Sequence, residues 1–119
     1  MGLSLVIPCY NADYHLLHNL LDEFSKQTKA PNEIIVSSSG LKEPIDAPPP
    51  KNVTIAGESV PVIHVNSKKR LYAGAARNRG ADVVNSQLIM FFDVDDIPHP
   101  QKIELTLKIF SKNNMNAFV

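Results

Sequence analysis

The feature that most constrains the fold is an apolar run at residues 88–92, which is followed directly by Asp93, Val94, Asp95 and Asp96. Five apolar residues in succession predict a strand that is buried on both faces, and such strands belong to parallel sheets covered by helices. Ligands of these sheets bind beyond the carboxyl ends of the strands. Carboxylates this close together repel one another, which favours a metal or phosphate site there. The alternative is that Asp96 caps the next helix and the other two are solvated.

The composition indicates one small domain, which we assign to residues 1–119. Twelve basic and twelve acidic side chains leave no net charge, whereas general affinity for nucleic acid normally shows as a basic surplus. Cys9 is the single cysteine, so no intrachain disulfide forms and a reducing compartment is expected. The sequence has no apolar run of membrane-spanning length and no signal peptide at its start. We therefore expect a cytoplasmic protein with no nucleic-acid partner.

The first forty residues predict a strand, a helix and a second strand. Residues 3–7 form an apolar strand that Pro8 ends, because proline cannot donate to a ladder. An amphipathic helix follows over about residues 13–27, with Asn11 or Asp13 as its cap. Residues 33–36 form the second strand. This order begins a right-handed parallel crossover.

The next segment is irregular. Residues 41–52 carry Pro44, Pro48, Pro49 and Pro50, which predict an extended loop inside the domain rather than a helix. Two short extended segments follow at residues 53–55 and 60–65, and only the second is expected in the core. Pro61 is expected at the start of that strand or on a sheet edge.

The last part of the chain predicts two helices around the apolar strand. The first covers about residues 72–84, and small residues at Ala73, Ala76 and Gly80 allow it to approach a sheet closely. Residues 103–110 fit both strand alternation and a helix. We predict a helix, because a buried parallel strand must be followed by a crossover. Residues 117–119 predict the opening of another strand.

Four segments, in matching order and spacing, resemble motifs of the family-two glycosyltransferases with the GT-A fold. They are residues 6–11 (VIPCYN), 33–36 (EIIV), 74–80 (GAARNRG) and 92–96 with 99–103 (FDVDD with HPQKI). The resemblance spans nearly the whole chain. It implies an α/β fold that is Rossmann-like, with a mostly parallel sheet flanked by helices, apparently truncated. It also implies a donor-binding portion that holds a nucleotide diphosphate sugar, a UDP-sugar above all, through Mn²⁺ or Mg²⁺.

The resemblance also implies roles for individual residues. Asp95 resembles the metal-binding carboxylate of the D-x-D motif, and Asp93 resembles the first Asp, which faces the ribose or the water shell of the metal. Arg77 matches an arginine on the nucleotide side. The turn that shapes the nucleotide pocket is matched by Pro8, Tyr10 and Asn11. The Tyr10 ring has two open interpretations, packing on the base or belonging to the core.

The chain departs from the family where the base is read. Family members carry Asp-Asp-Gly-Ser after the second strand, and one of those carboxylates pairs with the base; here Ser38 and Ser39 occupy those places. A serine hydroxyl lacks the charge and reach of a carboxylate. The family's acceptor-binding half and its catalytic base lie beyond residue 119, so no catalytic residue is assigned. The basic run at residues 68–70 has two interpretations, attraction of the diphosphate or a solvated turn, and the solvated turn is preferred.

Three functions remain open on these grounds. The first is the donor-binding portion of a glycosyltransferase, with an unknown glycan, lipid or protein acceptor. The second is a non-catalytic binding or interaction module that kept the fold. The third is a sugar nucleotidyltransferase, which the segment at residues 8–11 disfavours because those enzymes carry a glycine- and arginine-rich phosphate loop there. An open sheet edge after the last strand predicts a homo-oligomer or a partner that covers it.

Overall fold

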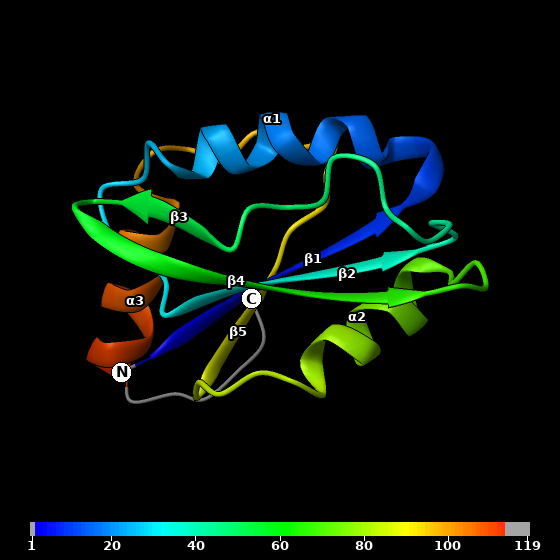
Figure 1. Ribbon diagram of the computed structural model, residues 1–119. Helices are drawn as coiled ribbons and strands as arrows, with labels where there is room; N and C mark the ends of the chain where they lie inside the picture. Colours follow the sequence, from blue (N-terminus) through cyan, green and yellow to red (C-terminus); the bar gives the residue numbers. More distant parts are fainter. Residues whose placement is uncertain (1, 114–119) are drawn as a thin grey trace.

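The computed structural model describes residues 2–113 and contains a five-stranded sheet between two helix layers (Figure 1). Its strand order is β3-β4-β2-β1-β5, in which every neighbouring pair is parallel except β3 with β4. The elements in chain order are β1 (Leu3–Tyr10), the 3-10 helix η1 (Asn11–Asp13), α1 (Tyr14–Phe24), β2 (Glu33–Ser39), β3 (Asn52–Ile55), β4 (Glu58–Ser67), α2 (Ala73–Ala81), β5 (Leu88–Phe91) and α3 (Lys102–Asn113). The predicted strand at residues 117–119 lies outside the described residues.

Alternation along β1 divides the core between the two faces of the sheet. Leu5 and Ile7 point to the layer that holds the apolar residues of α1 and α3. Val6 points to the opposite layer, where Ala81 of α2 lies. Figure 1 shows α1 and α2 on opposite sides of the sheet. Both faces of the sheet are therefore covered, as the apolar run at residues 88–92 predicted.

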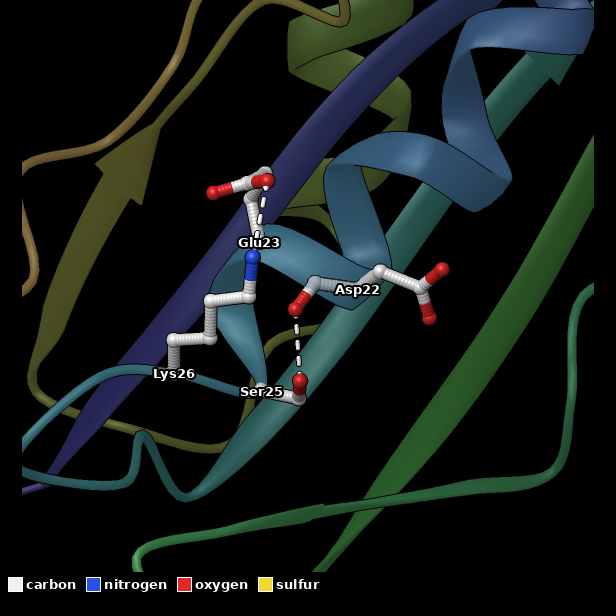
Figure 2. A network of polar contacts seen from close by, with 4 residues as sticks. All are labelled: Asp22, Glu23, Ser25 and Lys26. Carbon is white, nitrogen blue, oxygen red and sulfur yellow. Dashed lines mark hydrogen bonds and ion pairs between the residues drawn. The ribbon is translucent and has the colours of Figure 1, made fainter.

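The first helix differs from its predicted bounds. A 3-10 turn precedes α1, which starts at Tyr14, and neither Asn11 nor Asp13 caps it through its side chain. The helix ends at Phe24, and side chains at its end contact residues three positions earlier. The Ser25 hydroxyl donates to the Asp22 carbonyl at 2.5 Å, and Lys26 pairs with Glu23 at 3.2 Å (Figure 2).

The second strand is longer than residues 33–36, because it includes all three serines that follow. Parallel pairing with β1 continues to the pair Tyr10 and Ser39, and β4 pairs with the other edge of β2 as far as Ser67. Hydroxyl side chains that a local pattern assigns to a loop are thus fixed inside the sheet. Ser39 ends this strand beside Tyr10.

The two extended segments of the middle region form a hairpin. Ala56 and Gly57 make its turn, both with positive φ (50° and 79°), the conformation that two-residue hairpin turns require. Pro61 lies within β4, and the prediction that it starts the strand or sits on an edge is wrong. It immediately precedes Val62, where pairing with β2 begins, so its missing N–H falls outside that ladder.

The buried strand β5 is at one end of the described sheet, although its sequence resembles that of a central strand. Leu88 and Met90 are fully buried on one face, and Ile89 is buried on the other. Its single strand neighbour among residues 2–113 is β1. None of the helices in that part of the chain has the length and hydrophobicity needed to cross a membrane.

The segment after β5 forms the predicted helix α3. The first turn of α3 is capped by the Gln27 side chain and not by Asp96. Gln27 Oε1 accepts a hydrogen bond from the Ile103 N–H at 3.1 Å. The same amide donates to the His99 carbonyl at 2.7 Å. Because Gln27 follows α1 and is almost fully buried, it fixes α3 against the end of α1 across a large sequence separation.

Candidate functional site

A crevice of about 260 Å³ opens at the carboxyl ends of β1, β2 and β5. Pro8, Tyr10 and Ser39 contribute from the ends of β1 and β2, and Asp93 and Asp95 contribute from the segment after β5. The loop before α2 and the start of that helix form the remaining wall. This is where ligands of parallel α/β sheets bind, since successive strands deliver their ends to one edge.

Three carboxylates cluster after β5, and two of them, those of Asp93 and Asp95, line one end of the crevice. One ligand oxygen from each of Asp93, Asp95 and Asp96 lies within 4.8 Å of the other two, with Asp93 half-buried and the others exposed. Arg77 Nη2 from α2 donates to Asp93 Oδ1 at 3.1 Å and offsets part of this negative charge. Clustered carboxylate oxygens form a hard ligand set that suits Mg²⁺ or Mn²⁺. The arrangement can hold a divalent cation next to an anionic ligand.

The structure brings five of the predicted site residues together around the crevice, namely Pro8, Tyr10, Ser39, Asp93 and Asp95. Arg77 reaches this group through its ion pair with Asp93. Two predicted residues lie elsewhere. Asn11 lines a separate hollow beneath the proline-containing loop, and Ser38 is fully buried within the sheet.

The Ser38 hydroxyl takes part in a polar cluster behind the crevice. It lies 2.6 Å from His64 Nε2 and donates to Asn66 Oδ1 at 3.1 Å. Asn66 Nδ2 in turn donates to the Leu41 carbonyl at 3.2 Å, where the proline-containing loop begins. Burial lowers the pKa of His64, while Glu43 acts in the opposite direction. Ser38 therefore connects β2, β4 and the loop, whereas Ser39 faces the crevice.

Sequence reasoning missed Arg70 and Tyr72. The Arg70 guanidinium carbon lies 4.2 Å from the centre of the Tyr10 ring and 5.4 Å from that of Tyr72, and both residues line the crevice. The basic run at residues 68–70 was interpreted as solvated because a run of charges has no periodicity that indicates burial. Its position directly before a helix that starts at the sheet edge was the available signal.

Cys9 also lines the crevice, but its thiol group is unreactive. The side chain is buried, and burial, with a smaller contribution from Asp13, raises the pKa of its thiol to about 12. A thiol with that pKa is protonated near neutral pH and is a poor nucleophile. Cys9 is therefore a small buried residue and not a nucleophile.

The mostly parallel sheet between helix layers, with a crevice at its carboxyl edge, defines a GT-A-type fold. A solved structure with the same arrangement is that of Staphylococcus aureus TarS 1–349 in complex with UDP, which superposes with a TM-score of 0.66 at 15% sequence identity. That match covers 96% of this chain and 33% of the TarS chain. The low identity makes it evidence for the fold alone.

The family follows from the sequence comparisons. The model of Glycosyl transferase family 2 matches residues 4–119, and the chain belongs to this family. An uncharacterized glycosyltransferase of Haemophilus influenzae is 29% identical over 115 residues, which cover 96% of this chain and 36% of that protein. The amylovoran biosynthesis glycosyltransferase AmsB of Erwinia amylovora is 27% identical over 115 residues, covering 94% and 36%. The chain thus spans about a third of the length of the curated relatives it matches.

Proposed function

We propose that this chain is the donor-binding portion of a glycosyltransferase and holds a nucleotide diphosphate sugar through Mn²⁺ or Mg²⁺. The observation that carries the proposal is that Asp93 and Asp95 line the crevice and that one oxygen of each lies within 4.8 Å of the other and of an oxygen of Asp96. Family membership over residues 4–119 supports glycosyl transfer as the reaction class. A UDP-sugar is the proposed donor, and the structural neighbour TarS was solved in complex with UDP.

Asp95 is the principal proposed metal ligand. It is exposed and has no ion-pair partner within residues 2–113, so its oxygens are available to a cation. Asp93 has one oxygen directed to Arg77, which leaves its second oxygen for the cation or the ribose. Asp95 and the second oxygen of Asp93 would hold the divalent cation, which would supply positive charge to offset the negative charge that develops on a leaving nucleoside diphosphate.

Arg77 is proposed to orient Asp93. Its Nε is buried and has no hydrogen-bond partner in the described part of the chain, while its Nη2 holds the carboxylate. A guanidinium in this position holds the Asp93 carboxylate in place beside the crevice through a charge-assisted hydrogen bond. Arg77 therefore belongs to the nucleotide side of the proposed site through its contact with Asp93.

A binding or interaction module without donor function is the second candidate. The observation that favours it is the burial of Ser38, whose hydroxyl serves the fold at a position where the family motif has a carboxylate. Such a module would use the same sheet without needing the acidic cluster. Nucleotide binding therefore separates the two candidates.

The test is calorimetric titration of the chain with UDP, GDP, CDP and TDP, each with and without Mn²⁺. We expect binding to require the metal. Asp95→Ala should abolish that requirement and weaken binding more than about 100-fold, since loss of an outer-shell partner alone costs about 10- to 100-fold. Asp93→Ala should weaken binding less.

The matched control is Asp22→Ala, which removes one carboxylate far from the crevice. Asp22 is exposed and does not line the crevice, and its side chain points away from the contacts drawn in Figure 2. This variant therefore changes the charge and leaves those contacts in place. It should bind as the wild type does. Equal, metal-independent binding by the wild type and Asp95→Ala would refute the metal site. Absence of any nucleotide binding would favour the interaction module.

A further inference from the structure

The crevice has two chemically different ends. They lie at strands β2 and β5, which are two strand spacings apart in the sheet. The carboxylates follow β5, whereas Ser39 ends β2, and β1 lies between these strands. Neighbouring strands are spaced by about 4.8 Å, so the two ends are on the order of 10 Å apart. In a nucleoside diphosphate, the ribose separates the base from the phosphates. A diphosphate at the acidic end would place its base toward Ser39.

Aromatic rings and one guanidinium form the wall at the β2 end. The Tyr10 ring is fixed there by Gly40, which has a φ of 75°; a Cβ on that glycine would lie 2.8 Å from Tyr10 Cε1. Arg70 covers the ring, with its guanidinium carbon 4.2 Å from the ring centre. Tyr72 lies on Arg70 at 5.4 Å and is 77% exposed. Cation–π contacts on this scale hold a planar guanidinium in one orientation.

Arg70 and Arg77 differ in how their guanidinium N–H donors are used within the protein. Arg77 gives its Nη2 to Asp93. Arg70 has ring contacts but no hydrogen bond to or ion pair with any acceptor in residues 2–113. A guanidinium carries five N–H donors. Its stacking on tyrosine leaves those donors available to a ligand in the crevice.

We propose that Arg70 is the residue that binds the base of the donor nucleotide, through hydrogen bonds from its guanidinium to a base carbonyl. This inference rests on the proposed function, because it assumes that the diphosphate occupies the acidic end. The guanidinium also occupies the face of Tyr10, so the base contacts Arg70 and not the Tyr10 ring. Arg70 thus supplies donors where the family motif has an accepting carboxylate.

Because Arg70 supplies hydrogen-bond donors where the family motif supplies an acceptor, it selects bases that carry an accepting group. Uracil, thymine, cytosine and guanine each carry an exocyclic carbonyl oxygen, whereas adenine carries an amino donor instead and accepts only through its ring nitrogens. Arg70 therefore favours carbonyl-bearing bases over adenine and separates the carbonyl-bearing bases from one another only weakly. The expected substrates are nucleoside diphosphate sugars of those bases, and an adenosine diphosphate sugar is disfavoured.

Binding of UDP, ADP and inorganic pyrophosphate, each with Mn²⁺, tests the inference on the intact chain. Arg70→Ala should weaken UDP binding about 10- to 100-fold, as expected for loss of a charged hydrogen-bond partner. It should change pyrophosphate binding less than about twofold and remove the preference for UDP over ADP. Arg70→Lys keeps the positive charge but lacks the planar guanidinium. We expect it to bind UDP almost as weakly as Arg70→Ala does.

Lys69→Ala is the matched control, because Lys69 is exposed, carries the same charge and does not line the crevice. It should bind all three ligands as the wild type does. UDP binding that is equal in the wild type and Arg70→Ala would overturn this inference and leave the proposed function standing. An equal loss for UDP and pyrophosphate would also overturn it, because Arg70 would then act on the phosphates. A wild-type chain that binds no nucleotide would instead overturn the proposed function.

Discussion

Two adjacent serines at the end of β2 have opposite environments. Ser38 is buried against His64 and Asn66, where its hydroxyl completes a polar cluster. The Ser39 side chain is also buried, but Ser39 lies at the crevice wall, and its hydroxyl makes one long contact of 3.4 Å with the Leu71 carbonyl. Alternation along a strand sends neighbouring side chains to opposite faces. Ser39 therefore borders the crevice, and Ser38 does not.

At the residue scale, Ser39→Asp should increase the preference for UDP over CDP. A carboxylate accepts from the ring N–H of uracil, which cytosine lacks, and such a charged hydrogen bond is worth about 1.5–3 kcal/mol, or about tenfold or more in affinity. The ratio of the two dissociation constants, measured by calorimetry with Mn²⁺, checks this. A wild-type chain that already prefers UDP a hundredfold would contradict the prediction, because another group must then read the base.

Ser38→Asp serves as the comparison for that variant. It places a charge at a fully buried position beside His64, so it should lower the free energy of unfolding without sharpening base preference. Urea unfolding of both variants separates the two effects. Similar base preference in the two variants would indicate a change in overall charge, not a contact at the crevice.

The helix α2 shows how small residues bring an element to the sheet. Gly80 faces β1 and β2 so closely that an added Cβ would lie 2.5 Å from Val6 Cγ1 and 3.3 Å from Ser37 Cβ. Ala76 is buried one turn earlier, and Arg77 follows it. Close approach of this helix is what carries the Arg77 guanidinium to Asp93. The predicted role of the small-residue stripe is confirmed at Ala76 and Gly80, whereas Ala73 is exposed and lines the crevice.

At the element scale, Gly80→Ala should reduce the free energy of unfolding by about 1–3 kcal/mol, the typical cost of overpacking a core. Gly74 in the same helix is the control, because a Cβ there meets nothing within 4 Å. Gly74→Ala should stabilise the protein by about 0.5–1 kcal/mol through the higher helix propensity of alanine. Urea unfolding followed by circular dichroism measures both. Equal effects of the two substitutions would contradict the close packing of α2.

At the scale of the whole molecule, residues 2–113 provide the crevice at the sheet edge and no second wall opposite it. Direct displacement at a sugar carbon needs an acceptor hydroxyl held in line and a base within hydrogen-bond reach. After Asp96 the sequence contains Glu104 as its one carboxylate side chain. Glu104 lies on α3 and pairs with Lys108 at 3.3 Å. The curated relatives are about three times as long as the matched region.

We therefore expect this chain by itself to bind donor without transferring sugar. Incubation with labelled nucleotide sugars and a panel of glycan, lipid and peptide acceptors, with Mn²⁺ present, should give no product above a metal-free control. Calorimetry on the same preparation confirms that it is folded and binds nucleotide. Metal-dependent transfer at about 1 s⁻¹ or faster, within the usual range for enzymes, would contradict the prediction and place the catalytic base within these residues.

The sequence by itself determined the order and type of most elements. Apolar periodicity at residues 3–7 and 88–92 reports burial directly, because a strand enclosed on both faces must be apolar throughout. Motif order also predicted that Pro8, Tyr10, Asp93 and Asp95 would share one edge, since parallel strands bring their carboxyl ends together. The crevice lined by these residues agrees with that expectation.

Only the tertiary structure decided which polar side chains meet. The stack of Arg70 on Tyr10, the capping of α3 by Gln27 and the engagement of Ser38 by His64 join residues far apart in the chain. The position of β5 at the end of the described sheet likewise depends on which strands pair. Local periodicity records how far a side chain is buried, but it does not record its partner, because contacts between distant segments form only when the helices pack on the sheet.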